Sequence, residues 1–210
     1  MDKQAREQTL KILSEVYAGA RPALRYNTAY ELLIAVILSA QCTDERVNKV
    51  TAELFKEHAT PEAMLTLSQE ELEKYIYSCG LYKSKAAHIL SASRDIIEKF
   101  GGIVPENFND LKSLAGVGQK TANVVSSVWF DKDAIAVDTH VFRVSNRLGL
   151  AHANTPLKTE EQLKEAIPKE HWSEAHHWLI WHGRRVCHSQ KPDCANCPLA
   201  ECCDHYKNGR

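Results

Sequence analysis

Two residues of opposite charge, Lys120 and Asp138, each follow a turn-like stretch and precede a helical pattern. An amine can attack a sugar carbon, and a nearby carboxylate can stabilise the positive charge that develops there. An ordinary lysine is almost fully protonated at pH 7, so a nucleophilic amine needs desolvation in a cleft wall and a helix N-terminus beside it. The pattern predicts a covalent catalyst. The structural alternatives are a solvated lysine and a simple aspartate N-cap.

Gly116 and Gly118 lie directly before Lys120, in the sequence LAGVGQKTA. Two glycines one residue apart predict a tight hairpin whose backbone N–H groups point outward at a helix N-terminus, an arrangement that binds phosphate. An ordinary glycine turn is the alternative for a bare GVG. The stretch is not a Walker loop, because Gln119 occupies the position of the glycine that precedes the Walker lysine.

Four cysteines near the C-terminus, Cys187, Cys194, Cys197 and Cys203, have the spacing C-x6-C-x2-C-x5-C. Four thiolates in one short loop can hold an iron–sulfur cluster or a single tetrahedral ion. Structural zinc sites more often use two short C-x2-4-C pairs, and only one such pair occurs here, so the spacing favours an iron–sulfur cluster and zinc is the alternative; the [4Fe–4S] type follows from the resemblance described below. Such a group would staple the loop that carries Lys191.

The elements that must position these residues are helical. Apolar residues recur at helical spacing, and capping residues precede such runs: Thr28, either Thr43 or Asp44, Thr60 and Ser68. Residues 134–137 are too few for a convincing strand. The sequence predicts an all-α fold of many short helices. The expected helices cover residues 7–17, 28–40, 43–55, 84–100, 138–150, 159–167 and 171–186, with further helix starts at 60 and 68 and a short segment at 108–114.

Composition adds limits. The 210 residues carry a formal net charge of −1, so any nucleic-acid surface must be a local basic patch. The N-terminus lacks the apolar core of a signal peptide, and the longest apolar run, residues 32–38, is far shorter than the ~20 residues of a membrane span. We therefore expect a soluble protein that is cytoplasmic and nucleoid-associated.

Three motifs carry a resemblance that spans nearly the whole chain: LAGVGQKTANVV, AVDTHVFRVSNRLGL and the four-cysteine loop. In this order and spacing they resemble the endonuclease III family, helix-hairpin-helix DNA glycosylase/AP lyases with an iron–sulfur cluster. The resemblance implies a six-helix barrel domain (22–132) and a [4Fe–4S] cluster domain formed by both termini (1–21 and 133–210). It also implies that a damaged pyrimidine is flipped out of the duplex.

The same resemblance assigns roles to residues. Lys120 would be the Schiff-base nucleophile and Asp138 its partner carboxylate. Gln41 would fill the space of the flipped base and Leu81 would wedge into the opposite strand, against the alternatives of a helix C-cap and a buried loop anchor. His140 would shape the site. Basic side chains near these motifs are expected to hold phosphates: Arg143, Arg184, Arg185 and Lys191.

The function expected from these residues is a bifunctional DNA glycosylase/AP lyase of base excision repair. It would act as a monomer on double-stranded DNA containing damaged pyrimidines or abasic sites. An adenine-mismatch glycosylase of the same superfamily is the nearest alternative; Lys120 argues against it, as does the end of the chain seven residues after Cys203. A non-catalytic DNA-binding module and an electron carrier are alternatives from other classes.

Overall fold

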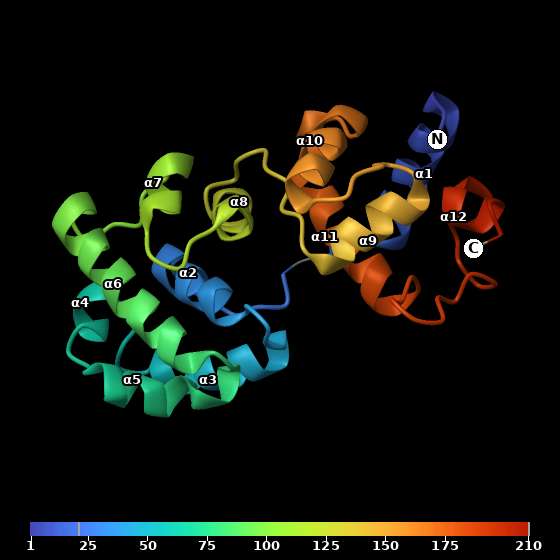
Figure 1. Cartoon of the computed structure of the whole chain (residues 1–210). Coiled ribbons are helices and arrows are strands. Elements are labelled where there is room, and N and C mark those ends of the chain that lie inside the picture. The colour runs from blue at the N-terminus through green and yellow to red at the C-terminus, as the bar shows by residue number, and fades with distance from the viewer. Residues whose placement is uncertain (21, 210) are drawn as a thin grey trace. The chain divides into compact units, whose positions relative to one another are not determined.

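The computed structural model describes residues 1–20 and 22–209, and within them every regular element is a helix (Figure 1). The expected all-α fold is confirmed. The contacts divide the chain into two compact units. One is the continuous segment Pro22–Asp131, and the other combines the two ends of the chain, before Pro22 and after Asp131.

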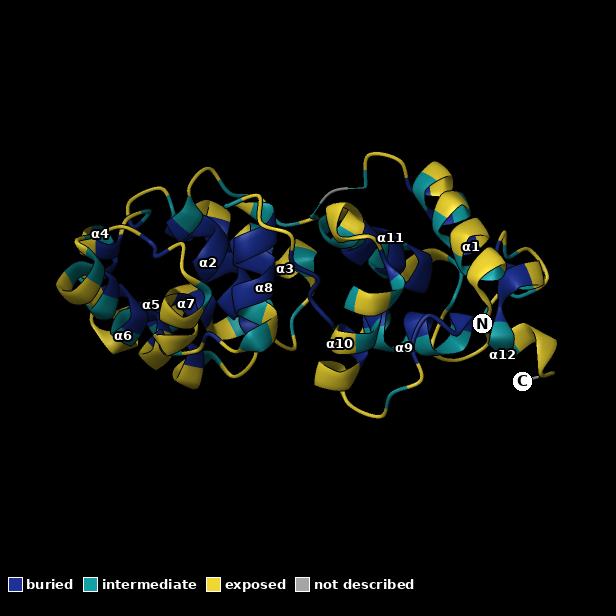
Figure 2. Ribbon diagram, turned by 90° about the horizontal axis from the view of Figure 1, so that it is seen from above, coloured by how far each residue is buried: buried dark blue, intermediate teal, exposed yellow. Residues whose placement is uncertain are grey.

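The unit Pro22–Asp131 is built around α2 (Ala29–Leu38), in which residues 30–38 are all buried, as the dark blue of Figure 2 shows. Helices α6 (Tyr82–Phe100) and α8 (Gln119–Val128) pack against α2. The predicted N-caps Thr28, Thr60 and Ser68 each accept a backbone N–H three residues on, and of the two candidates Thr43 and Asp44 the cap is Thr43. The remaining helices of this unit are α3 (Asp44–Leu54), α4 (Pro61–Met64), α5 (Gln69–Ile76), the 3₁₀-helix η1 (Tyr77–Cys79) and α7 (Phe108–Ser113).

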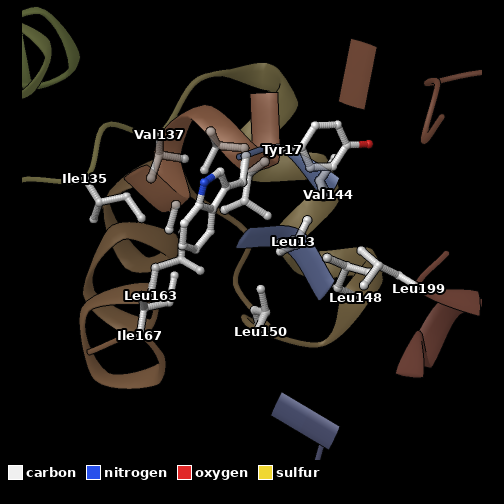
Figure 3. Close-up of a cluster of buried hydrophobic side chains, with 14 of the residues drawn as sticks. Leu13, Tyr17, Ile135, Val137, Val144, Leu148, Leu150, Leu163, Ile167 and Leu199 are labelled. Atoms are coloured by element: carbon white, nitrogen blue, oxygen red, sulfur yellow. The ribbon is translucent and has the colours of Figure 1, made fainter. Parts of the chain in front are cut away.

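The other unit has one core to which both ends of the chain contribute. Figure 3 shows Leu13 and Tyr17 from the first segment packed with Val144, Leu148 and other apolar side chains of the second. Its helices are α1 (Lys3–Val16), α9 (Thr139–Leu148), α10 (Pro156–Ala166), η2 (Lys169–His171), α11 (Trp172–Arg185), η3 (Ala200–Cys202) and α12 (Asp204–Lys207). Helices α9 and α1 both pack on α11.

Some boundaries differ from the sequence prediction. Helix α10 begins at Pro156 and not at Thr159, because Thr155 is the N-cap and Pro156 takes the first helical position, where its missing N–H costs nothing. Helix α6 begins two residues before the predicted Ser84. The short segment after residue 107 is helical, capped by Asn107. None of the described helices is both long and apolar enough to cross a membrane.

Candidate active site

The hairpin before Lys120 connects α7 to α8. Leu114 and Val117 are buried, and the Val117 N–H donates to the Leu114 carbonyl at 3.1 Å, which closes the turn. Gly116 has φ +78°, and a Cβ there would lie 2.9 Å from the Cβ of His88 on α6. Only glycine satisfies both constraints. The predicted helix-hairpin-helix therefore forms, held to α6 at Gly116.

Gly118 is the N-cap of α8 and differs from Gly116. Its backbone is extended (φ −89°, ψ −177°), so its conformation does not require glycine. A Cβ at Gly118 would meet no heavy atom within 4 Å, and no side chain caps the helix. The position before the first turn of α8 is therefore open at Gly118. Lys120, the second residue of α8, is exposed; the burial expected for a nucleophilic amine is not provided within its own unit.

Gln41 and Leu81 lie on turns with left-handed backbone, at φ +52° and φ +50°. Both structural alternatives considered for them are wrong. The C-cap of α2 is Ser39, so Gln41 does not end that helix. The Leu81 side chain is 58% exposed, so it anchors no buried loop. Both side chains are available to a partner.

Asp138 is the N-cap of α9, and its Oδ1 accepts the Val141 N–H at 2.8 Å. That bond and the positive end of the α9 dipole stabilise the carboxylate. His140 lies two residues after Asp138, and burial lowers the pKa of its imidazole. The Asp138 charge opposes this shift, whereas the charges of Arg143 and Arg184 lower the pKa further. Asp138, His140, Arg143 and Arg184 therefore share one electrostatic environment.

Arg143 is committed to its own unit. Its Nε and Nη2 donate to the Cys187 carbonyl at 3.1 and 3.0 Å, and Nη2 also reaches the Gly183 carbonyl at 3.0 Å and Nδ1 of His140 at 3.2 Å. These bonds tie α9 to the end of α11. The guanidinium, predicted as a phosphate contact, is thus occupied by backbone carbonyls.

The other predicted phosphate contacts are exposed. Arg184 and Arg185 lie over the Trp181 ring, 5.8 and 4.6 Å from its centroid. Lys191 has φ +49° in a loop that the Asp193 N–H closes on the Val186 carbonyl at 3.0 Å.

Two residues that position this region were not identified from the sequence. Arg147 donates through Nη1 to the His188 carbonyl at 2.6 Å and to Cys187 Sγ at 3.5 Å. Gly183 lets α9 and α11 approach, since a Cβ there would lie 3.1 Å from both His140 and Val144. The four-residue spacing of Arg143 and Arg147 places them on one helix face, which was the available signal.

The four predicted ligands, Cys187, Cys194, Cys197 and Cys203, line one open pocket. Burial raises the pKa of the Cys197 and Cys203 thiols, and the charges of the neighbouring cysteines raise it further. Within the described residues, however, no three His, Cys, Asp or Glu side chains are arranged to hold a single metal ion.

His182 connects this pocket to the core. The Tyr17 hydroxyl lies 2.9 Å from His182 Nδ1, and His182 Nε2 lies 3.7 Å from Cys197 Sγ. Burial raises the pKa of Tyr17 to about 12 and lowers that of His182 to about 4. A protonated phenol donating to a neutral imidazole leaves Nε2–H to donate to the sulfur. Such outer hydrogen bonds orient metal-binding side chains.

The predicted residues fall into three groups. The first group is Gln41 and Leu81, which lie on two neighbouring turns. The second is Gly116, Gly118 and Lys120, which lie at the hairpin and the start of α8. Both groups belong to the unit Pro22–Asp131. The other unit holds the four cysteines together with the following residues: Asp138, His140, Arg143, Arg184, Arg185 and Lys191. Each unit thus contains one member of the predicted pair, Lys120 in one and Asp138 in the other.

Comparison with known proteins agrees with this arrangement. Residues 34–169 match the family described as HhH-GPD superfamily base excision DNA repair protein. The chain is 47% identical over 205 residues to endonuclease III of Haemophilus influenzae, covering 98% of this chain and 97% of that protein. It is 48% identical over 198 residues to endonuclease III of Bacillus subtilis, covering 94% and 90%.

Solved structures give the same result. A trapped endonuclease III–DNA covalent intermediate superimposes with a TM-score of 0.95 at 45% identity, covering 100% of this chain and 99% of that one. A non-covalent endonuclease III–DNA complex matches equally well, with a TM-score of 0.95 at 45% identity and coverage of 100% and 98%. The chain belongs to the HhH-GPD superfamily of base excision DNA repair proteins and, within it, to the endonuclease III family of DNA glycosylase/AP lyases.

Proposed function

We propose that the chain excises oxidised pyrimidines from duplex DNA through a Schiff base at Lys120 and then cleaves the strand 3′ to the lesion. The observation that carries the proposal is the exposed Lys120 amine at the uncapped start of α8, beside the open space at Gly118. A relative at 45% identity was solved as a covalent intermediate with DNA, which is what an amine nucleophile would form. A bound duplex would exclude water from the amine and supply the desolvation that its own unit does not.

The reaction has four balanced steps. The neutral Lys120 amine attacks C1′, the glycosidic bond breaks, and the base leaves with a proton from the new ammonium. The sugar ring opens at C1′–O4′, giving an imine, and O4′ takes a proton. Loss of a C2′ proton then breaks the C3′–O bond and releases the 3′ strand. Water hydrolyses the imine and frees the lysine.

Asp138 would stabilise the oxocarbenium charge at C1′ and pass the proton that the attacking amine loses on to the leaving base. Its cap bond to Val141 uses one carboxylate oxygen, Oδ1. The α9 dipole stabilises a negative charge at this position by roughly 0.3 to 2 kcal/mol.

DNA would be held by backbone and side chains together. The N–H groups at the start of α8 suit a phosphate, because Gly118 leaves room for close approach. Arg184, Arg185 and Lys191 are exposed and suit neighbouring phosphates. Gln41 and Leu81 would enter the duplex and recover part of the stacking energy lost when the base flips. His140 would shape the site around Asp138.

The cysteine pocket suits a [4Fe–4S] cluster better than zinc. Structural zinc sites more often use two short C-x2-4-C pairs, whereas Cys194 and Cys197 form the single such pair among these four cysteines. Arg147 and His182 would donate to the Cys187 and Cys197 sulfurs and favour their thiolate forms. When bound, the cluster supplies a covalent crosslink that fixes the loop carrying Lys191.

An activity panel tests the proposal. Duplexes containing an oxidised pyrimidine, an abasic site or an adenine mispair are each incubated with the protein, and base release and strand cleavage are measured separately. Release of the pyrimidine with cleavage 3′ to the site is the expected result. Adenine release without cleavage would support the mismatch glycosylase instead, and binding without either product would leave only a DNA-binding module.

The partner and location follow from this substrate. We propose that the protein acts as a monomer on damaged duplex DNA and works at the nucleoid, in the cytoplasm, as a DNA substrate requires. Size-exclusion chromatography of the free protein and its DNA complex tests the monomer. A stable dimer in both samples would contradict it.

A further inference from the structure

Lys85, in the first turn of α6, is a buried lysine that the proposed reaction does not use. Lys85 is only 4% exposed. The three protons of its ammonium have three acceptors: the carbonyls of Leu38 at 2.8 Å, Ala40 at 2.7 Å and Cys79 at 2.6 Å. The ammonium is therefore fully satisfied by backbone oxygens alone.

These three carbonyls belong to two separate segments. Leu38 and Ala40 lie at the end of α2, where carbonyls lack helical partners and a positive charge is favourable. Cys79 ends η1. Burial raises the pKa of the Cys79 thiol to about 12, so the sulfur is neutral and the ammonium pairs with carbonyls only. One side chain thus joins the end of α2 to the start of α6.

Each joined segment leads directly into an exposed, left-handed residue. Gln41 follows Ala40, and Leu81 comes two residues after Cys79. Left-handed backbone is unfavourable for residues other than glycine and persists only where the surroundings impose it. The two turns also touch, because a Cβ on Gly80 would lie 3.7 Å from the Gln41 carbonyl oxygen.

We propose that Lys85 is a positioning residue that holds the Gln41 and Leu81 turns together as one rigid element for opening the duplex. This inference rests on the proposed function, in which those two side chains enter the DNA. An element that inserts must displace stacked bases, and it does so effectively only if its own conformation is already fixed. Without the three hydrogen bonds, each turn could relax independently.

The test replaces Lys85 with methionine, which keeps the buried chain length and removes all three donors. The matched control is Lys99→Met on the same helix, whose amine is exposed and pairs with Asp95 at 2.8 Å. Two quantities are measured with the protein in saturating excess over DNA, and both are corrected for the fraction of folded protein. The first is the rate of excision from duplex DNA. The second is the fluorescence of 2-aminopurine placed opposite the lesion, which rises when that base unstacks.

We expect Lys85→Met to slow excision at least tenfold and to lose most of the fluorescence rise, with Lys99→Met like wild type. In a Gln41→Ala/Leu81→Ala background, Lys85→Met should have no further effect, because the element it positions is already gone. A multiplicative effect in that background, or a wild-type fluorescence rise in Lys85→Met, would overturn the inference. If Lys85→Met does not fold, Lys85→Gln, with two donors on a shorter chain, is judged by the same criteria.

The two proposals fail in different ways. If the proposed function is wrong, the wild-type protein releases no oxidised pyrimidine. If only the role of Lys85 is wrong, the wild-type protein is active and Lys85→Met opens the duplex as well as wild type does.

Discussion

Asp138 has two roles at the residue scale, a structural cap for α9 and a catalytic carboxylate, and one substitution separates them. Asparagine is as good an N-cap as aspartate but carries no charge. We expect Asp138→Asn to unfold at the wild-type temperature and to lose about 10²-fold or more in excision rate. Thermal unfolding and single-turnover excision measure the two effects.

Asp138→Ala is the companion variant, since it loses the bond to Val141 as well as the charge. It should lose activity and also about 1 kcal/mol of unfolding free energy. If Asp138→Asn excised bases at the wild-type rate, Asp138 would be only a cap.

Two cations predicted to bind phosphate should now behave differently. Arg143 is bonded to carbonyls of Gly183 and Cys187, whereas Lys191 is exposed at a loop. Lys191→Ala should weaken DNA binding and reduce the slope of log K against log salt by about 1, with unchanged stability. Arg143→Ala should instead cost about 1–3 kcal/mol of unfolding free energy, because it leaves buried carbonyls without donors.

Fluorescence anisotropy over a series of salt concentrations, with denaturant unfolding alongside, separates the two variants. An unchanged salt slope in Lys191→Ala would remove that lysine from the DNA surface.

Whether the role of a single residue can be predicted from the sequence depends on how far away its interaction partners lie along the chain. Asp138 could be predicted as an N-cap, because its partner is three residues away. Lys85 could not be recognised, since a helical lysine is usually solvated and its acceptors include carbonyls 45 and 47 residues away in sequence. Gly183 likewise depends on the side chains of another helix.

At the element scale, the hairpin contains one glycine that the backbone requires, Gly116, and one that it does not, Gly118. Gly116→Ala forces a side chain into left-handed backbone and against His88, so we expect a loss of about 1–3 kcal/mol in unfolding free energy. Gly118→Ala meets open space with ordinary backbone and should cost less than about 1 kcal/mol.

For DNA affinity we expect the opposite order, with Gly118→Ala the more damaging of the two variants. The methyl group of Gly118→Ala occupies the space where a phosphate would approach, so duplex binding should weaken roughly tenfold, or about 1.4 kcal/mol. Denaturant titration and binding titration on the same samples test the pair. Full DNA affinity in Gly118→Ala would rule out phosphate binding at the start of α8.

The helices themselves were largely predictable, because their starts are encoded in adjacent residues. Ser68 and Glu71 form a complete capping box, visible as a serine three residues before a glutamate. The start of α10 was placed too late because apolar periodicity begins after Pro156, although the Thr155–Pro156 pair was the stronger signal. Turn geometry was less accessible, since nothing local to Gln41 or Leu81 favours left-handed backbone.

At the scale of the whole molecule, stability should depend on pH through a partly buried histidine. Burial, helped by the neighbouring His176, lowers the pKa of His177 from 6.5 to about 3. The unfolded chain therefore binds the proton first as the pH falls. The contribution of His177 to stability is complete above about pH 6.5 and is lost by at most about 1.4 kcal/mol per pH unit down to about pH 3.

Thermal unfolding between pH 7.5 and pH 5 tests this dependence. His177→Gln should reduce the slope of the curve over that range without abolishing it, because His182, whose pKa burial lowers to about 4, contributes a dependence of the same sign. An identical pH dependence in His177→Gln would assign the effect to other groups.

The central claim is that the Lys120 amine forms a covalent bond to the sugar, and borohydride trapping tests it most directly. Wild-type protein and Lys120→Ala are each mixed with duplex DNA containing an oxidised pyrimidine, and borohydride is added to reduce the imine. The covalent protein–DNA adduct is then quantified on a denaturing gel. We predict an adduct with wild type and none with Lys120→Ala, whose fold should be unchanged because the side chain is exposed. An adduct of equal yield in Lys120→Ala, or strand cleavage at the wild-type rate, would contradict the account.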